Sequence, residues 1–68
     1  MKKVIVFTEG VLDARWLFAD IICVFGVEPF VTPVEAGDVV EFLADEETAA
    51  AIAVVLTHKG WDCLAEDA

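Results

Sequence analysis

The chain has 68 residues, of which 59% are apolar, and its 13 acidic side chains outnumber four basic ones to give a formal net charge of −9. A chain of this length is expected to form one domain, residues 1–68, and to bury only about 60% of the surface of its unfolded state. The negative charge disfavours direct binding to nucleic acid or to an anionic membrane, and favours a protein partner with a basic surface. The apolar fraction exceeds what one small core needs, so we expect exposed apolar patches that mark contacts.

The first half of the chain is predicted to form a strand, a helix and a second strand. Residues 4–7 are a short apolar run rich in β-branched side chains, which is typical of a buried central strand. Residues 11–25 have helical periodicity and end at Gly26, a common C-terminal cap. Residues 27–34 are rich in strand formers, and their two prolines cannot donate backbone hydrogen bonds, which indicates an edge strand.

The second half is predicted to form a strand, a helix and a last strand. Residues 39–43 pair as a hairpin with the preceding strand through a turn at 35–38. Asp45 is a suitable N-cap for the second helix, and two glutamates follow in its first turn, where the helix dipole favours negative charge. The helix ends at Gly60, and the alternation in residues 61–66 predicts the last strand.

The order of these elements, β-α-β-β-α-β, predicts an α+β fold of the ferredoxin-like type. We expect a plait with two helices on one face of a four-stranded antiparallel sheet. Right-handed crossovers place the first and third strands in the centre and the second and fourth at the edges. The proline-containing strand then lies at an edge, where prolines are tolerated.

Two stretches of the chain resemble ACT domains. They are the apolar run 4–7 followed by Gly10–Val11–Leu12, and the segment 39–50, which is followed by Gly60–Trp61. Small PII-like signal-transducing domains of the plait type are similar too. The resemblance implies a regulatory domain that pairs with a second copy and binds amino acids near the loop after the first strand. In this chain that loop contains the candidate ligand residues Thr8, Glu9 and Gly10.

The sequence contains no pattern typical of catalysis, metal binding or a cofactor. His58 is the one side chain with a reference pKa near neutrality, and no serine occurs that it could activate. Asp45, Glu46 and Glu47 are consecutive, so on a helix their side chains point in different directions, and no calcium-loop spacing is present. We therefore expect no enzyme activity, no metal and no cofactor.

The two cysteines and the apolar segments suggest a cytoplasmic protein. Cys23 and Cys63 have no zinc or redox spacing, and we interpret them as buried free thiols, with a disulfide between them as the alternative. Residues 17–34 form the longest apolar stretch, but it contains two acidic residues and two prolines and cannot cross a bilayer. No targeting segment is recognised.

Several apolar side chains do not fit the predicted core face of the first helix, and others lie on the edge strand. The predicted partner interface therefore consists of Trp16, Leu17, Val24, Phe30 and Val31. A second predicted feature is an acidic surface that consists of Asp13, Asp20, Asp45, Glu46 and Glu47.

These features favour a non-catalytic interaction module that regulates a partner by protein–protein binding and forms a homodimer. A second hypothesis is a phage anti-defence inhibitor, similar to anti-CRISPR proteins, whose carboxylates stand where the phosphates of a nucleic acid would lie. A third hypothesis is a stand-alone amino-acid sensor of the ACT type.

Overall fold

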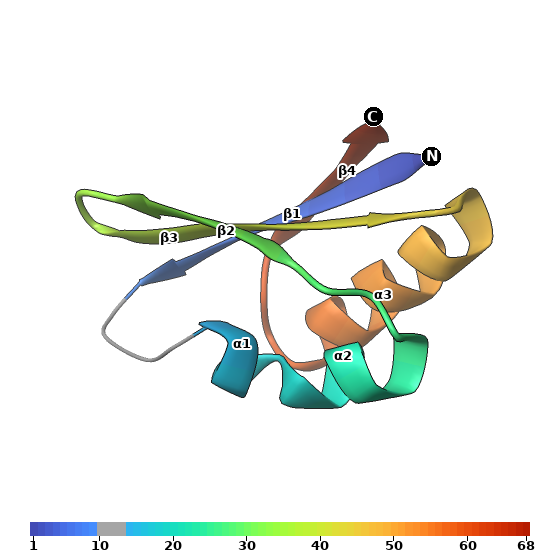
Figure 1. The fold of residues 1–68 in the computed structure, drawn as a ribbon, viewed down its shortest axis with the longest axis horizontal. Helices are drawn as coiled ribbons and strands as arrows, with labels where there is room; N and C mark the ends of the chain where they lie inside the picture. Colours follow the sequence, from blue (N-terminus) through green and yellow to red (C-terminus); the bar gives the residue numbers. More distant parts are fainter. Residues whose placement is uncertain (10–13) are drawn as a thin grey trace.

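The apolar runs of the sequence form four strands, and the segments of helical periodicity pack beneath them (Figure 1). The computed structural model describes residues 1–9 and 14–68, and everything below refers to these. The fold is α+β, as predicted, and contains a four-stranded antiparallel sheet. In chain order the elements are β1 (Lys2–Glu9), α1 (Ala14–Leu17), α2 (Ala19–Phe25), β2 (Phe30–Val34), β3 (Gly37–Ala44), α3 (Glu46–His58) and β4 (Cys63–Asp67).

The strand order is β2-β3-β1-β4, with the two eight-residue strands β1 and β3 in the middle. β1 pairs with β3 along its whole length, from Lys2 opposite Ala44 to Glu9 opposite Gly37. β2 is an edge strand that begins at Phe30, so Pro29 precedes it and only Pro33 lies within it. This arrangement is compatible with a ferredoxin-like plait.

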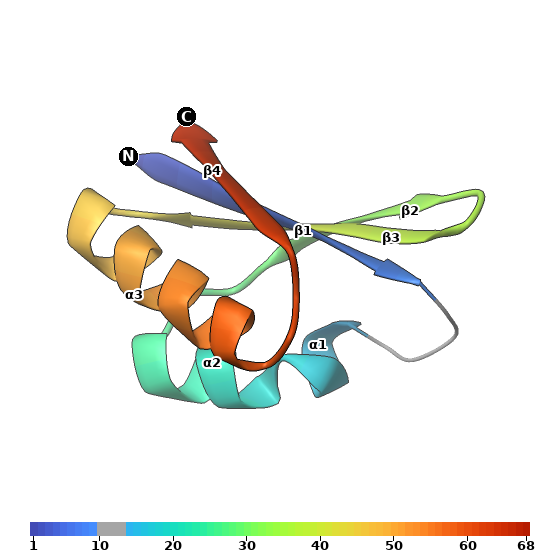
Figure 2. The ribbon, with the colours of Figure 1, turned by 180° about the vertical axis from the view of Figure 1, so that it is seen from behind.

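The described helices all lie on the same side of the sheet, and the opposite side carries no other layer (Figures 1 and 2). The prediction of one helix over 11–25 is wrong in its described part, because α1 and α2 are separate segments that meet at Phe18. The backbone of Phe18 has φ −108° and ψ 24°, which is not helical. Its ring is fully buried, and it packs edge-on against Phe42 at 5.8 Å and Trp61 at 5.6 Å between ring centres. The helix is therefore interrupted at a fully buried aromatic residue of the core.

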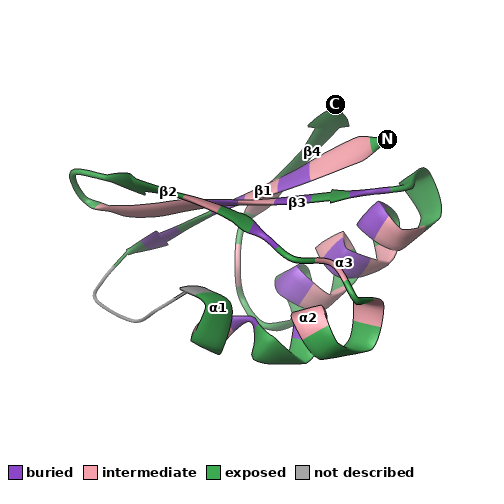
Figure 3. Cartoon of the chain, viewed as in Figure 1, coloured by how far each residue is buried: buried purple, intermediate pink, exposed green. Residues whose placement is uncertain are grey.

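The core lies between the sheet and the helical layer (Figure 3). The strands contribute the side chains of alternate residues, and α3 contributes one face. The fully buried large side chains are Val4, Val6, Phe18, Ile21, Val40, Phe42, Ile52 and Leu56. One polar residue is buried with them: the Thr8 hydroxyl donates a hydrogen bond to the Asp38 carbonyl at 3.4 Å.

Three aspartates stabilise the ends of elements. Asp45 caps α3, where its carboxylate accepts a hydrogen bond from the Thr48 amide at 2.7 Å, as predicted for an N-cap. Asp20 pairs with Lys59 at 2.5 Å and links α2 to the end of α3. Asp67 pairs with Lys2 at 2.6 Å and joins β4 to β1. In each case the hydrogen bond to the carboxylate lowers the pKa of the aspartate below its ordinary value.

The close approach of β3 to β1 requires glycine at position 37. A Cβ atom there would lie 2.0 Å from the Thr8 carbonyl oxygen, which is backbone and cannot move aside while β1 and β3 stay paired. We predict that Gly37→Ala lowers the free energy of unfolding by about 1–3 kcal/mol, measured by urea denaturation. Ala36→Gly in the same hairpin is the control, with a loss below about 1 kcal/mol. Equal effects of the two substitutions would contradict this explanation.

The lowered pKa values predict a specific sensitivity to acid. Because the folded pKa of Asp20 is below its unfolded value of about 3.9, its stabilising contribution is complete above that pH and is lost as the pH falls through the folded pKa. We predict that the midpoint temperature of unfolding decreases when the pH is lowered below about 4. In the Asp20→Asn variant this decrease should be less steep. Asp62→Asn removes a carboxylate from an exposed loop and is the matched control. Parallel pH profiles for Asp20→Asn and the unmodified chain would exclude this contribution.

Candidate interaction surfaces

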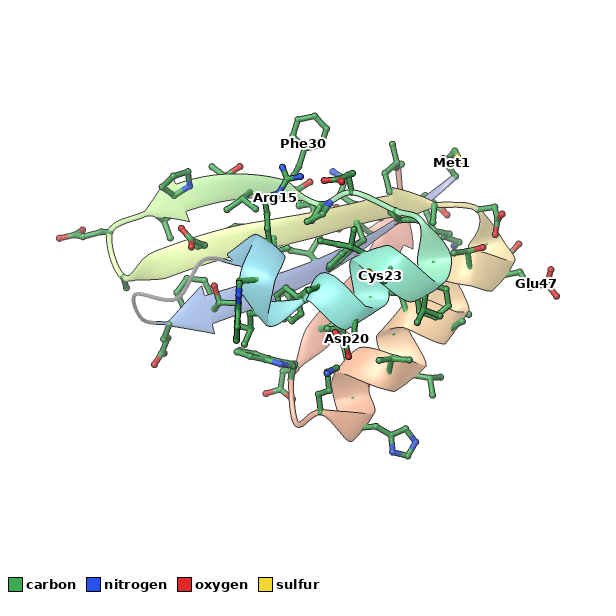
Figure 4. The ribbon with its side chains drawn as sticks, turned by 60° about the horizontal axis from the view of Figure 1, so that its bottom comes forward. Met1, Arg15, Asp20, Cys23, Phe30 and Glu47 are labelled. Atoms are coloured by element: carbon green, nitrogen blue, oxygen red, sulfur yellow. The ribbon has the colours of Figure 1, made fainter. Side chains whose placement is uncertain are left out.

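The five residues of the predicted partner interface lie on both sides of the sheet and do not form one patch. Trp16 on α1 is 77% exposed and Val24 on α2 is 75% exposed, both in the helical layer. Phe30 on β2 is 75% exposed and projects from the opposite side of the sheet (Figure 4). Leu17 and Val31 are half-buried and pack against the core.

The register of the sheet explains why Phe30 and Val31 separate. Directly opposite residues in adjacent strands point to the same face. Val31 lies opposite Val40, which is buried against the helices, whereas Phe30 lies opposite Glu41 on the other face. Neighbouring residues of a strand always diverge in this way.

The face of the sheet that points away from the helices is mostly apolar, and we call it the open sheet face. It contains the strand residues that alternate with the buried ones. Its apolar members are Ile5, Phe7, Phe30, Val34, Val39, Leu43 and Leu64. Nine large apolar side chains are exposed in the described part of the chain, and five of them belong to this set: Phe7, Phe30, Val34, Leu43 and Leu64.

This face corrects one prediction. The run of residues 4–7 was expected to be a buried central strand. Val4 and Val6 are fully buried, but Phe7 is 40% exposed, because the described helices cover only the other face of the sheet. The sequence gave no indication of this in β1, where both faces carry apolar residues.

The charged groups of the open sheet face are largely paired within the chain. Lys3 lies 3.5 Å from Glu41 and 3.9 Å from Glu66, measured from Nζ to the carboxylate oxygens. All three side chains are partly exposed, so each pair contributes little to stability. Their effect is local neutralisation, because one lysine offsets much of the charge of two glutamates. Glu9 and Thr32 are the other polar residues of this face.

The helical layer presents smaller apolar hollows next to charges. A hollow of about 80 Å³ between α2 and α3 is lined by Asp20, Ile21, Val24, Phe25 and Val55. A second hollow of about 290 Å³ lies on α3 and is lined by Ala53, Val54, Thr57 and His58. His58 is exposed at the last residue of the helix. Val24 therefore borders a groove that a partner side chain could enter.

The predicted acidic residues are spread over the molecule. Asp45, Glu46 and Glu47 are exposed at the start of α3, where they border a hollow of about 520 Å³. Asp20 is paired with Lys59 at the other end of the 13-residue helix, about 20 Å away at 1.5 Å per residue. Asp13 lies outside the described residues.

The candidate ligand loop is described only in part. Thr8 is buried with its hydroxyl bonded to Asp38, Glu9 is exposed, and Gly10 lies outside the described residues. Next to Glu9 is a hollow of about 360 Å³, which is lined by Phe7, Glu9, Gly60, Trp61 and Asp62. Trp61 and Asp62 were not named as candidate ligand residues, although the predicted antiparallel pairing of the last strand with the first brings the α3–β4 connection to this end of β1.

The two cysteines are free thiols and do not form a disulfide. Cys63 is half-buried, with its sulfur 3.8 Å from the Ala53 carbonyl oxygen. Cys23 is exposed on α2, so the prediction of a buried thiol is wrong for this residue (Figure 4). It lies on the side of α2 that faces solvent because Ile21 occupies the core side.

Residues 1–9 and 14–68 contain no group of three or more His, Cys, Asp or Glu side chains that could hold a metal ion. None of the helices in this part of the chain is long and apolar enough to cross a bilayer. The chain matches no protein-family model, no curated protein and no solved structure. The resemblance to ACT and PII-like domains therefore stays a prediction, and the surfaces themselves must carry the functional argument.

Proposed function

We propose that this chain is a non-catalytic, acidic interaction module that regulates a partner by protein–protein binding and also self-associates. The observation that carries the proposal is the exposure of Trp16, which leaves most of a large aromatic side chain in solvent. Tryptophan is enriched among the residues that dominate binding energies, because it buries much apolar area with few rotatable bonds. Exposure of the Trp16 side chain to solvent does not stabilise an isolated subunit.

The surroundings of Trp16 favour a partner with an apolar and basic surface. Val24 is similarly exposed in the same helical layer, beside the groove between α2 and α3. The chain has a net charge of −9, and Asp20 borders the groove beside Val24. A partner with basic side chains at the edge of an apolar contact would be attracted from a distance and then held by burial.

We assign the topology to the ferredoxin-like plait, with α1 and α2 together in the place of its first helix. Such a fold hosts many unrelated functions and does not itself define one. It supports the proposal in one respect, because a two-layer plait leaves one face of its sheet without cover.

The proposal predicts that Trp16 anchors a partner. The chain is immobilised and incubated with an extract of the cells that encode it. We expect the Trp16→Ala variant to fail to capture proteins that the unmodified chain captures. For a purified partner the dissociation constant should rise at least about tenfold, or about 1.4 kcal/mol. Val54→Ala, also an exposed apolar residue, is the matched control on α3. If Trp16→Ala lowers the thermal midpoint but leaves binding unchanged, Trp16 has only a packing role.

A second candidate function, nucleic-acid mimicry by an anti-defence inhibitor, is favoured by the exposed run of Asp45, Glu46 and Glu47. Three carboxylates at one end of a helix could replace phosphates in a basic channel. The pairing of Asp20 with Lys59 argues against an extended track of free charges.

Salt dependence separates the two candidates. If mimicry is the function, affinity for a basic nuclease should fall by orders of magnitude between about 50 and 200 mM salt, and Glu46→Gln with Glu47→Gln should flatten that slope. If the contact around Trp16 dominates, we expect a weak salt dependence and little effect of the two glutamine substitutions. The measurement is the dissociation constant over a salt series, by calorimetry or interferometry.

A further inference from the structure

We propose that the open sheet face is the surface through which two copies of this chain pair, face to face, about a two-fold axis. The inference rests on the self-association included in the proposed function and assigns it a surface. That surface differs from the one around Trp16 and lies on the opposite side of the sheet.

The apolar side chains of this face include two cross-strand pairs. Ile5, on a central strand, lies opposite Leu64 on β4, and Phe7 lies opposite Val39 on β3. Phe30 adds an exposed apolar ring on the edge strand β2, where it lies opposite Glu41, the residue that separates it from Ile5. When two sheets stack at about 10 Å, side chains of this kind interdigitate and form a core between them. A second copy would give four layers, with helices outside and two sheets inside.

Pairing through the sheet edges is disfavoured at both ends of the sheet. The β2 edge contains Pro33, which has no amide hydrogen to donate to a neighbouring strand. The β4 edge has five residues and contains Glu66 and Asp67, so two copies side by side would bring carboxylates together. The face remains as the route by which two sheets can meet.

The charges favour a second copy over a basic partner on this face. Two copies that each carry −9 repel, so they can meet only where charge is low. On the open sheet face Lys3 already neutralises part of the charge of Glu41 and Glu66, which leaves a basic partner few free carboxylates there. In a two-fold interface a patch contacts the same patch of the second copy, so the patch must be apolar or carry charges of both signs. The open sheet face is mostly apolar, and its charged residues have both signs.

The area of the face indicates a weak dimer. The four strands contain 8, 8, 5 and 5 residues, and with about 3.3 Å per residue and 4.8 Å between strands the face projects over about 400 Å². Two faces would bury at least about 800 Å², which lies at the lower end of the range for specific, transient interfaces. We expect the dimer to form at concentrations on the order of 100 μM.

The experiment is sedimentation of the full chain and two variants over a range from about 10 μM to 1 mM. The apparent mass of the unmodified chain should increase with concentration from the monomer mass of 7.4 kDa toward twice that value. Leu64→Glu places a carboxylate on the open sheet face, where the leucine is 60% exposed, and should weaken the dimer at least about tenfold. Val54→Glu adds the same charge at a site on α3 that is 57% exposed, and should dimerise nearly as the unmodified chain does.

Circular dichroism establishes that each variant is folded, and Phe30→Ser replaces Leu64→Glu if the latter unfolds. In NMR spectra, the backbone amide chemical shifts that change with protein concentration should belong to strand residues around Ile5, Phe7 and Leu64. A chain that stays monomeric to 1 mM, a Val54→Glu variant as impaired as Leu64→Glu, or shifts confined to α1 and α2 would each overturn the inference. Failure here leaves partner binding through Trp16 unaffected, because Trp16→Ala and Leu64→Glu act on opposite sides of the sheet.

Discussion

The central strands β1 and β3 carry apolar side chains on both faces, and the helices cover only one of them. Val4 and Val6 meet the helical layer, while Ile5 and Phe7 point to the other side. A strand with this composition is typical of a sheet buried on both sides. The chain has no further element in the described residues to supply the second cover. Most of what can be inferred about its function comes from this imbalance.

The covered face shows how few residues make the core. Phe18 reaches between Phe42 of the sheet and Trp61 after α3, and the helix is interrupted to place it there. Because a small domain buries a limited fraction of its surface, each such side chain contributes a large share of the stability. Trp61 is used in this core, whereas Trp16 is left exposed. The two tryptophans therefore have different roles, and the exposure of Trp16 agrees with its predicted position away from the core face of the first helix.

Local patterns of the sequence predicted most of the elements. Asp45 followed by two glutamates marked the start of α3, and Gly60 marked the end, because capping depends on neighbouring residues. The alternation in residues 61–66 predicted β4, in which Cys63 and Ala65 lie on the helix side and Leu64 on the other. The break at Phe18 was not predictable, because it depends on rings that lie 24 and 43 residues away in the chain.

The candidate surfaces were harder to predict than the elements. Phe30 and Val31 are adjacent in sequence, and both were expected at one interface. The strand directs them to opposite faces, and the direction of each depends on the register with β3. The predicted acidic surface likewise combined Asp20 with Asp45, although α3 separates their positions and Lys59 pairs with one of them. Composition indicated that apolar and acidic surface would be exposed, and only the pairing of strands shows where.

An exposed apolar sheet is ordinarily a risk, because it can stack or extend without limit. In this chain Pro33 and the acidic end of β4 disfavour extension at the edges, which leaves the open sheet face as a broad apolar surface for stacking. A two-fold pair through that face is closed, since it uses the whole patch of both copies. The carboxylates on the helical side then face solvent on both outer surfaces and repel further copies. In the proposed pair, Trp16 and Val24 would lie on both outer surfaces, where the proposed partner of opposite charge could bind them.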